Sequence, residues 1–344
     1  MDSRVTVAIL NWNGLAHLQQ FLPSVVSYSG EAIILVIDNA STDPSVGWIK
    51  NNYPKVELHI LTENMGFTGG YNEALNHIKT EYVVLLNSDV EVSEGWLGPL
   101  VNRMDSNPLI AACQPKIMAW RHKNTFEYAG AGGGFLDVLG YPFCRGRIFE
   151  TCEEDLGQYN SIRPVFWASG ACMMVRTSAF LHVGGFEKRF FAHMEEIDLC
   201  WRFWSRGYQV WVDPDSTVYH LGAGTLSHTS PKKTFLNYRN GIAMLFINSS
   251  VLQLLWKIPF RLILDGLAGL RFIAKGEWMN CLAVSKAHIS FYGGIRYWLK
   301  RRKENEKLIT TSIPESVFYR NSILPSYFLL GKKTFEGMGN ISDS

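Results

Sequence analysis

The first third of the chain alternates short apolar runs with segments of helical length. The apolar runs cover residues 5–10, 32–37, 82–86 and 109–113, and residues 56–61 alternate apolar with polar positions. The helical segments cover residues 15–26, 44–53, 70–79 and 93–104, and Ser93 is expected to cap the last of them. Apolar runs of this length suit strands that are covered on both faces. The alternation therefore predicts βαβ units, a mostly parallel sheet flanked by helices, and a binding edge in the loops after the strands.

The middle of the chain is less regular. Residues 120–163 are expected to form a long irregular loop region. Residues 165–175 return to a strand-like run, and residues 194–206 are predicted as a helix that ends at Gly207. Two short strands are predicted at 208–212 and 217–220, on either side of a turn at Asp213 and Pro214.

The last third of the chain is apolar and basic. Its pattern is helical from Thr234 to Lys303, and the polar tail 331–344 is expected to be disordered. The net charge of +2 hides an asymmetry, because residues 231–303 hold 13 lysines and arginines against two acidic residues. That stretch therefore carries +11 and the rest of the chain −9. A basic, apolar stretch joined to a mildly acidic body is typical of a protein that meets an anionic surface.

Basic residues in this stretch repeat at a spacing of four: Lys257 with Arg261, Arg271 with Lys275, and Arg296 with Lys300. Helices of this composition can lie flat in a membrane interface, where anionic lipid attracts them. A helical subdomain packed on the core, or an oligomer interface, is the alternative, because Pro259 and internal glycines interrupt the pattern. Nucleic acid is not an expected partner, since no nucleic-acid motif accompanies the basic residues.

Composition narrows the class of protein. Hydrophobic residues make up 47% and charged residues 19%, which excludes a disordered chain. The six cysteines contain no C-x-x-C pair and are interpreted as reduced thiols of a cytosolic protein. The sequence shows no signal-peptide layout and no apolar run long enough to span a bilayer. We therefore expect a cytoplasmic protein attached peripherally to the inner face of the cell membrane.

Polar residues follow the apolar run 82–86 directly, as Asn87, Ser88 and Asp89. Amide and carboxylate oxygens at a sheet edge are a suitable platform for Mg²⁺ or Mn²⁺, which often shares its ligands with substrate phosphates. The alternative is an ordinary turn, since Asn and Asp are common in turns and helix caps.

Three acidic residues, Glu195, Glu196 and Asp198, crowd the first turn of the helix expected at 194–206. A favourable interaction with the helix dipole is one explanation. Consecutive helical residues point about 100° apart, so Glu195 and Glu196 cannot both serve the same face. One of them can be structural while the other enters a cleft as a general base.

Three further features gain meaning only in combination. His220 ends a predicted strand, and a lone histidine is more often a core or loop residue than a ligand. Asp38 ends the second strand, where an acid reaches a ribose or a base in nucleotide-binding folds, although a turn explains it equally. Residues 64–72 form a glycine-rich loop that allows a ligand to approach the backbone closely. The loop matches neither a dinucleotide fingerprint nor a Walker loop, which argues against dehydrogenases and kinases.

Taken in order, these segments resemble the family 2 glycosyltransferases of the GT-A fold, close to the bacterial rhamnosyltransferase-like branch that builds surface polysaccharides. The resemblance rests on residues 8–14, 38–43, 64–72, 87–89, 169–176, 184–186 and 190–202, and it extends to His220. It implies a GT-A domain over 1–230, with a nucleotide-binding half at 1–115 and an acceptor and catalytic half at 116–230. The basic helical region would then occupy 231–330, before the disordered tail.

The resemblance also implies a role for each matching position. The nucleotide and donor sugar would be held by Asn11, Asn13, Asp38, Asn64, Gly66, Asn72 and Asn87. Mn²⁺ or Mg²⁺ would be bound by Asp89 and His220. Glu196 would be the general base, and the acceptor cleft would be bordered by Trp167, Ser169, Gly170 and Glu195.

Two positions depart from the commonest pattern of the family. Asn87 and Glu196 each replace an aspartate, which removes one charge from the metal site and moves the basic carboxylate by roughly 1.5 Å. The expected reaction is the inverting transfer of a sugar from a dTDP- or UDP-sugar, such as dTDP-rhamnose, to a hydroxyl of a lipid-linked glycan. The departures leave a catalytically inert nucleotide-sugar-binding scaffold as the alternative, and a nucleotidyltransferase as a third.

Overall fold

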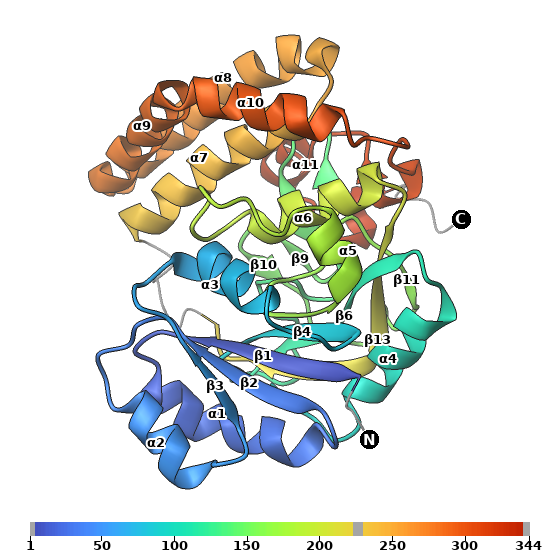
Figure 1. Ribbon diagram of the computed structural model, residues 1–344. Helices are drawn as coiled ribbons and strands as arrows, with labels where there is room; N and C mark the ends of the chain where they lie inside the picture. Colours follow the sequence, from blue (N-terminus) through green and yellow to red (C-terminus); the bar gives the residue numbers. More distant parts are fainter. Residues whose placement is uncertain (1–3, 223–229, 340–344) are drawn as a thin grey trace.

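A mixed nine-stranded sheet forms the centre of the computed structural model, which describes residues 4–222 and 230–339 (Figure 1). The strands run in the order β11-β13-β6-β12-β4-β1-β2-β3, and β5 pairs with β13. Their bounds are β1 Val5–Asn11, β2 Ile33–Asp38, β3 Glu57–Ile60, β4 Tyr82–Asn87, β5 Val90–Val92, β6 Ile110–Ala119, β11 Arg163–Pro164, β12 Cys172–Arg176 and β13 Gln209–His220. The expected α/β fold with a sheet between helices is confirmed.

The first four strands, β3-β2-β1-β4, are parallel and match the predicted apolar runs. Three helices connect them: α1 Leu15–Tyr28, α2 Ser45–Asn52 and α3 Gly66–Leu75. Helix α4 Leu97–Ser106 follows β5 and leads to β6. Two details of the prediction are wrong. Helix α3 begins four residues early, at Gly66, and α4 begins at Leu97, because the Ser93 hydroxyl donates to the Thr217 carbonyl instead of capping a helix.

The second half of the sheet departs from the parallel pattern. Strand β12 lies between β4 and β6 and is antiparallel to both, whereas β13 runs parallel to β6. The two short strands expected around Asp213 and Pro214 form one strand, β13, in which the pairing register shifts between Asp213 and Thr217. Helices α5 Thr177–His182 and α6 Glu195–Ser205 lie between β12 and β13 in the sequence.

The region 120–163 is not an irregular loop. It contributes β7 Gly134–Asp137, β8 Pro142–Cys144, β9 Arg147–Ile148 and β10 Thr151–Cys152 to a second sheet of five strands. The fifth strand, β14 Phe318–Tyr319, pairs with β7 from the far end of the chain. The strands are too short to give a readable period, which explains why the sequence pattern missed them. The two sheets are joined where Gly134 pairs with Trp167.

A layer of helices lies on the side of the molecule opposite α1 and α2 (Figure 1). It consists of α7 Pro231–Asn248, α8 Val251–Ala274, α9 Trp278–Gly293 and α10 Ile295–Glu306, as the apolar pattern predicted. None of the helices in the described residues has the length and apolar character needed to cross a membrane.

The tail after Gly331 is ordered as far as Gly339, in contrast to the expected disorder. The tail contains the short helix η2 Glu336–Met338, and the segment before it contains η1 Glu315–Val317 and α11 Ile323–Phe328. Phe335 packs on Phe135 and Phe143 of the second sheet, and the Tyr319 hydroxyl donates to the Met338 carbonyl. The aromatic contacts therefore fix the end of the chain to the region around β7 and β8. Residues 340–344 lie outside the described part.

Candidate active site

The predicted nucleotide-binding residues meet at one edge of the central sheet. Asn11 pairs with Asp38 across β1 and β2, and Asn87 lies beside Leu10 across β1 and β4. The Asn11 amide donates to Asp38 Oδ1 at 3.2 Å and to Ser45 Oγ at 3.0 Å, while Asn11 Oδ1 is buried without a partner. This edge is formed by the carboxyl ends of parallel strands, where such sheets bind ligands.

Asn13 and Asn64 shape the loops around this edge. The Asn13 side-chain oxygen accepts from the Thr42 backbone N–H at 2.7 Å, with Asn13 itself in the left-handed region at φ 50°. The Asn64 oxygen accepts from the Asn39 amide at 3.1 Å and from the Gly66 N–H at 2.9 Å. The Asn13 side chain therefore fixes the loop after β2, and the Asn64 side chain fixes the loop before α3.

The start of α3 does not present free N–H groups, contrary to the expected close approach of a ligand there. The N–H groups of Phe67 and Thr68 donate to the Phe191 carbonyl at 2.7 and 3.2 Å. Gly66 has φ +70°, and a Cβ atom there would come within 2.5 Å of the Phe191 ring. Asn72 lies further along α3 and binds both backbone groups of Phe186, so its amide joins α3 to the loop before α6.

The predicted metal ligands Asp89 and His220 are in contact. His220 Nε2 lies 3.1 Å from Asp89 Oδ1 and 3.4 Å from the Asn87 amide nitrogen. On the other side of the ring, His220 Nδ1 lies 3.1 Å from Glu127 Oε2. All three members of this carboxylate–imidazole–carboxylate cluster (Asp89, His220, Glu127) are buried. Glu127 lies in the stretch expected to be a loop, and no motif pointed to it.

The cluster is electrostatically compensated. Burial alone would lower the pKa of His220, but the charges and hydrogen bonds of Asp89 and Glu127 outweigh it and raise that pKa well above its usual range. Burial likewise favours protonation of the carboxylates, yet the nearby imidazolium lowers the pKa of Asp89 and of Glu127. The imidazolium therefore lies as a cation between two carboxylates.

The donor set fits a divalent cation. Two ligands that each lie about 2.1 Å from one ion, at right angles, are about 3 Å apart. The 3.1 Å between Asp89 Oδ1 and His220 Nε2 matches that separation. Oxygen and imidazole ligands suit Mn²⁺, and Glu127 behind the ring corresponds to the carboxylate that orients many metal-bound histidines.

Glu195 and Glu196 begin α6 and differ from the cluster, because no cation among residues 4–222 and 230–339 lowers the pKa of either carboxyl. Glu195 is buried and Glu196 is partly exposed, but one carboxylate oxygen of each, Oε2, is buried without a hydrogen-bond partner. Loss of water around Glu196 raises its pKa to about 7. Burial, together with the charge of Glu196, raises the pKa of Glu195 well above its usual range. Glu195 is therefore the buried side chain of the pair and Glu196 the partly exposed one, as expected for consecutive helical residues.

The segment before α6 is strained and is held by α7. Phe191, His193 and Met194 all have φ near +70° (67, 69 and 70°), a conformation that costs free energy for residues other than glycine. The buried Asn240 amide donates to the carbonyl oxygens of Phe190, Ala192 and His193 at 2.8–3.0 Å. The C-terminal helices therefore support the backbone from which Glu196 projects.

A chain of contacts links the cluster around His220 to Glu196. Glu127 Oε2 accepts from the Ala129 N–H at 2.5 Å, and the Ser169 hydroxyl donates to the Ala129 carbonyl. The next residue, Gly170, lies against α6, where an added Cβ would be 3.9 Å from Glu196 Cβ. The carboxylates of Glu127 and Glu196 both act on the pKa of the Cys144 thiol, which burial raises. The two groups of acids therefore border the same region of the molecule.

Trp167 and Ser169 do not border an open cleft, in contrast to the expectation. The Trp167 indole is buried, covers Gly134 and donates to the Phe135 carbonyl at 3.0 Å. Ser169 is buried as well, and its N–H donates to Gln114 at 2.9 Å. These residues hold the two sheets together, and only Gly170 reaches the side of Glu196.

Two lysines at the start of α7 also lie near the site and were not singled out from the sequence. Lys232 Nζ is 4.9 Å from the centroid of the Phe191 ring. Burial lowers the pKa of Lys233, while the carboxylates of Glu127 and Glu150 oppose that effect. Lys233 therefore lies near Glu127 of the cluster and Lys232 lies near the segment before α6, so both are available to an anionic ligand.

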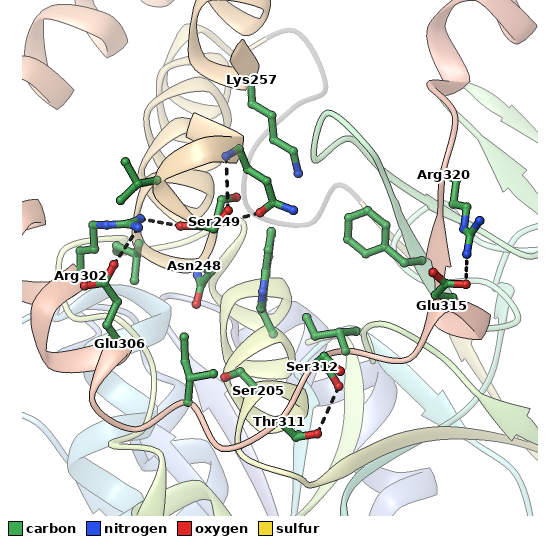
Figure 2. A pocket seen from close by; sticks show the side chains of 18 residues that line it. Ser205, Asn248, Ser249, Lys257, Arg302, Glu306, Thr311, Ser312, Glu315 and Arg320 are labelled. Atoms are coloured by element: carbon green, nitrogen blue, oxygen red, sulfur yellow. Dashed lines mark hydrogen bonds and ion pairs between the residues drawn. The ribbon is translucent and has the colours of Figure 1, made fainter. Parts of the chain in front are cut away.

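Two other features lie apart from this edge. A pocket of about 620 Å³ is lined by α6, α7, α8, α10 and the segment 309–320, and Lys257 extends into it (Figure 2). None of its lining residues belongs to the predicted site. A trio formed by His59, Glu73 and His77 has ligand atoms within 4.8 Å of one another, but Glu73 and His77 are exposed to solvent.

Comparison with known proteins bears directly on this geometry. The family model described as glycosyl transferase family 2 matches residues 6–183. The chain is 27% identical over 290 residues to the N-acetylglucosaminyl-diphospho-decaprenol L-rhamnosyltransferase of Mycobacterium tuberculosis. That match covers 79% of this chain and 92% of the relative.

Two solved structures share the fold. The mannosyltransferase PcManGT from Pyrobaculum calidifontis, in complex with GDP-Man and Mn²⁺, has a TM-score of 0.51 at 16% identity and covers 89% of this chain and 85% of its own. GalNAc-T7 with UDP, GalNAc and Mn²⁺ has a TM-score of 0.55 at 17% identity. It covers 71% of this chain, which spans about half (47%) of that protein.

Proposed function

The chain belongs to glycosyl transferase family 2, and from this premise we propose that it catalyses the inverting transfer of a sugar from a nucleotide-diphosphate sugar to a hydroxyl of a glycan. Family and fold establish a glycosyltransferase of the GT-A type, as the sequence resemblance predicted. The inversion at the anomeric carbon, the identity of the donor and the identity of the acceptor are what we propose.

The observation that carries the proposal is the placement of two unlike acidic groups around one region. Asp89 and His220 form a site that fits a cation, and Glu196 starts a helix that reaches the same region through Gly170. An inverting transfer needs stabilisation of the leaving diphosphate on one side of the sugar and a base on the other.

Different residues are assigned to the nucleoside and to the diphosphate of the donor. Asn11 and Asp38 hold the end of β1 against β2, and we assign the nucleoside to this edge. A divalent cation bound by Asp89 and His220 would act as a Lewis acid on the diphosphate. Lys232 and Lys233 supply further positive charge to the phosphates from the start of α7.

Glu196 supplies the base. Its carboxylate accepts the proton of the acceptor hydroxyl while that oxygen forms a bond to the anomeric carbon. The bond between the anomeric carbon and the diphosphate oxygen breaks in the same step, and the nucleoside diphosphate leaves with the electron pair. A single displacement inverts the anomeric configuration. The strained segment that Asn240 holds fixes the position of Glu196 before substrate arrives.

For the substrates, we propose a dTDP- or UDP-sugar as donor, with dTDP-rhamnose first, and a lipid-linked glycan as acceptor. The name of the mycobacterial relative, which contains both L-rhamnose and a decaprenol-linked acceptor, supports this choice. Surface polysaccharide synthesis is the process in which such a transfer has its place.

The test is release of nucleoside diphosphate from a panel of donors by the full-length protein, with Mn²⁺, Mg²⁺ or EDTA. We expect release that needs the metal and falls by roughly a thousandfold in Glu196→Gln, while donor binding is retained. Glu73→Gln, an exposed acid of α3, is the matched control and should leave release unchanged.

The same assay separates the alternatives. Donor binding without release under any condition would indicate a nucleotide-sugar-binding scaffold. Release of pyrophosphate from a nucleoside triphosphate would indicate a nucleotidyltransferase. Either result contradicts the proposed transfer.

A further inference from the structure

Helix α8 is oriented with its polar side inward. Its four buried residues are Lys257, Arg261, Asp265 and Gly269. Between Val251 and Leu270 the helix exposes no charged side chain at all, although it lies on the surface. Its exposed side is instead made of large apolar residues: Val251, Leu252, Leu255, Trp256, Phe260, Ile263, Leu267, Leu270 and Ile273. Helices on the surface of a water-soluble protein have the opposite arrangement.

The inward side is fixed by specific polar contacts. Arg261 donates to the Leu139 carbonyl at 3.2 Å, in the turn between β7 and β8. Asp265 lies 3.0 Å from His288 of α9 and 3.6 Å from Arg261. Lys257 extends into the pocket beneath the helix (Figure 2). If α8 rotated to bury its apolar side, Arg261 and Asp265 would lose their contacts with the Leu139 carbonyl and His288. The exposure of the apolar side therefore follows from the polar contacts of the fold.

Helix α9 extends the apolar side. Its exposed large residues include Trp278, Met279, Leu282 and Ile289. Together with the exposed apolar residues of α8 they form what we call the apolar face. Figure 1 shows both helices in the outermost layer of the molecule. An exposed apolar area of this extent marks a surface that another partner covers.

Positive charge borders the apolar face. Arg271 and Lys275 are exposed at the end of α8, and Lys286 is exposed on α9. Exposed bases continue along α10 at Arg296, Lys300 and Lys303. The stretch 231–303 as a whole carries +11. An anionic lipid surface offers both the apolar interior and the negative head groups that this arrangement matches.

We propose that the apolar face docks on an anionic phospholipid surface, with α8 parallel to the membrane plane. The apolar side chains enter the boundary between head groups and acyl chains, and the bordering lysines and arginines meet the lipid phosphates. Trp256 and Trp278 have the amphipathic rings that are enriched at this depth. A second copy of the chain fits less well, because self-association of this face would bring like charges together.

This proposal goes beyond the transfer reaction and does not depend on it. It rests on α8 and α9, whereas the proposed function rests on the sheet edge and α6. A failure of one therefore leaves the other standing, since vesicle binding is measured without donor or acceptor.

The test is co-sedimentation of the full-length protein with vesicles of phosphatidylcholine alone or mixed with phosphatidylglycerol. We expect binding to the mixed vesicles that weakens as salt screens the charges. In Leu255→Ser/Phe260→Ser/Ile263→Ser/Leu267→Ser the affinity should fall by about tenfold or more. Leu156→Ser, which removes an 84% exposed leucine far from α8 in the sequence, is the matched control and should bind like the unmodified protein.

Two further measurements keep the outcome clear. Because the four replaced side chains are exposed, the melting temperature of the fourfold variant should equal that of the unmodified protein. If it is lower, vesicle binding is measured with the single change Leu252→Asp instead. Arg271→Gln/Lys275→Gln should weaken binding to the mixed vesicles only. Equal vesicle binding by all variants would overturn the proposal. So would a dimer in light scattering that the fourfold variant converts to a monomer, which would assign the face to a second copy.

Discussion

The two acidic groups of the site are both withdrawn from water, yet they behave in opposite ways. Asp89 and Glu127 lie on either side of His220, which lowers the pKa of both carboxyls. In the part of the chain that the structure describes, no cation lowers the pKa of Glu195 or Glu196, and burial raises the pKa of both, that of Glu196 to about 7. The nature of the partner, more than the depth of burial, therefore decides the charge of a buried acid.

This difference gives the two groups different chemistry. Carboxylates that stay ionised around an imidazole form a site in which a cation can replace the proton of the ring. A carboxylate with a pKa near 7 is a strong enough base to accept a proton at neutral pH and is still ionised in part. Each of the following predictions tests one side of this comparison.

The largest effect is expected from removing the charge of Asp89. In Asp89→Asn, kcat/KM should fall by roughly a thousandfold or more, because the leaving diphosphate loses the stabilisation that a bound cation would provide. The measurement is nucleoside diphosphate release over a Mn²⁺ titration. His77→Ala, in the trio formed with His59 and Glu73, is the control and should keep the metal dependence unchanged. Full activity of Asp89→Asn would contradict the assigned site.

A smaller effect is expected at Glu127. The change Glu127→Gln keeps the shape of the side chain but removes the charge 3.1 Å behind His220 Nδ1. Metal affinity should fall by about 10- to 100-fold while kcat at saturating metal changes little. Isothermal titration with Mn²⁺ measures the first and steady-state rates the second. Glu81→Gln, which alters ion pairs with Arg4 and Arg176 away from the site, should leave both values unchanged. Loss of kcat alone would place Glu127 elsewhere in the mechanism.

The smallest effect is expected from pH. Because the pKa of Glu196 is raised to about 7, its ionised fraction is close to one at pH 8 or above and about a tenth at pH 6. The rate constant for transfer should therefore fall by about tenfold from pH 8 to pH 6. Single-turnover rates measure the chemical step separately from product release. A flat profile over this range would show that Glu196 is not the limiting base.

The same shift has a consequence for stability with a definite sign. The folded protein holds the Glu196 proton up to about pH 7, whereas the unfolded chain releases it near the ordinary value of 4.5. The contribution of Glu196 to the free energy of unfolding is thus present at low pH and decreases as pH rises from 4.5 through 7. In Glu196→Gln this slope should become shallower without disappearing, because burial also raises the pKa of Glu195. Denaturant titrations at several pH values would measure the change.

Much of the architecture follows from local pattern. The continuous apolar runs of the first third each became part of a buried strand, because a strand covered on both faces needs a continuous apolar stretch. The alternating segment 56–61 became β3, the partly exposed edge strand. The ends of those strands then brought Asn11, Asp38 and Asn87 to one edge. Glu195 and Glu196 separated into a buried and a partly exposed side chain, as the angle between consecutive helical residues requires.

Other features depend on contacts between distant parts of the chain. The second sheet pairs β7 with β14, which is more than 170 residues later, and neither strand is long enough to show a period. Glu127 became part of the site because the turn after β6 lies against the end of β13. Asn240 supports the segment before α6 from another part of the chain. No local rule connects these residues, since their partners are defined only by the folded chain.

Helix α8 shows most clearly the difference between what the local sequence pattern determines and what tertiary contacts determine. The spacing of Lys257, Arg261 and Asp265 already establishes a polar stripe on an apolar helix, because residues four apart share one face. Periodicity states that two faces differ, but it does not state which one points to water. That choice came from the Leu139 carbonyl and the His288 ring, which bind the charges from inside and leave the leucines outside. The sequence determined the stripe, and only tertiary contacts decided its direction.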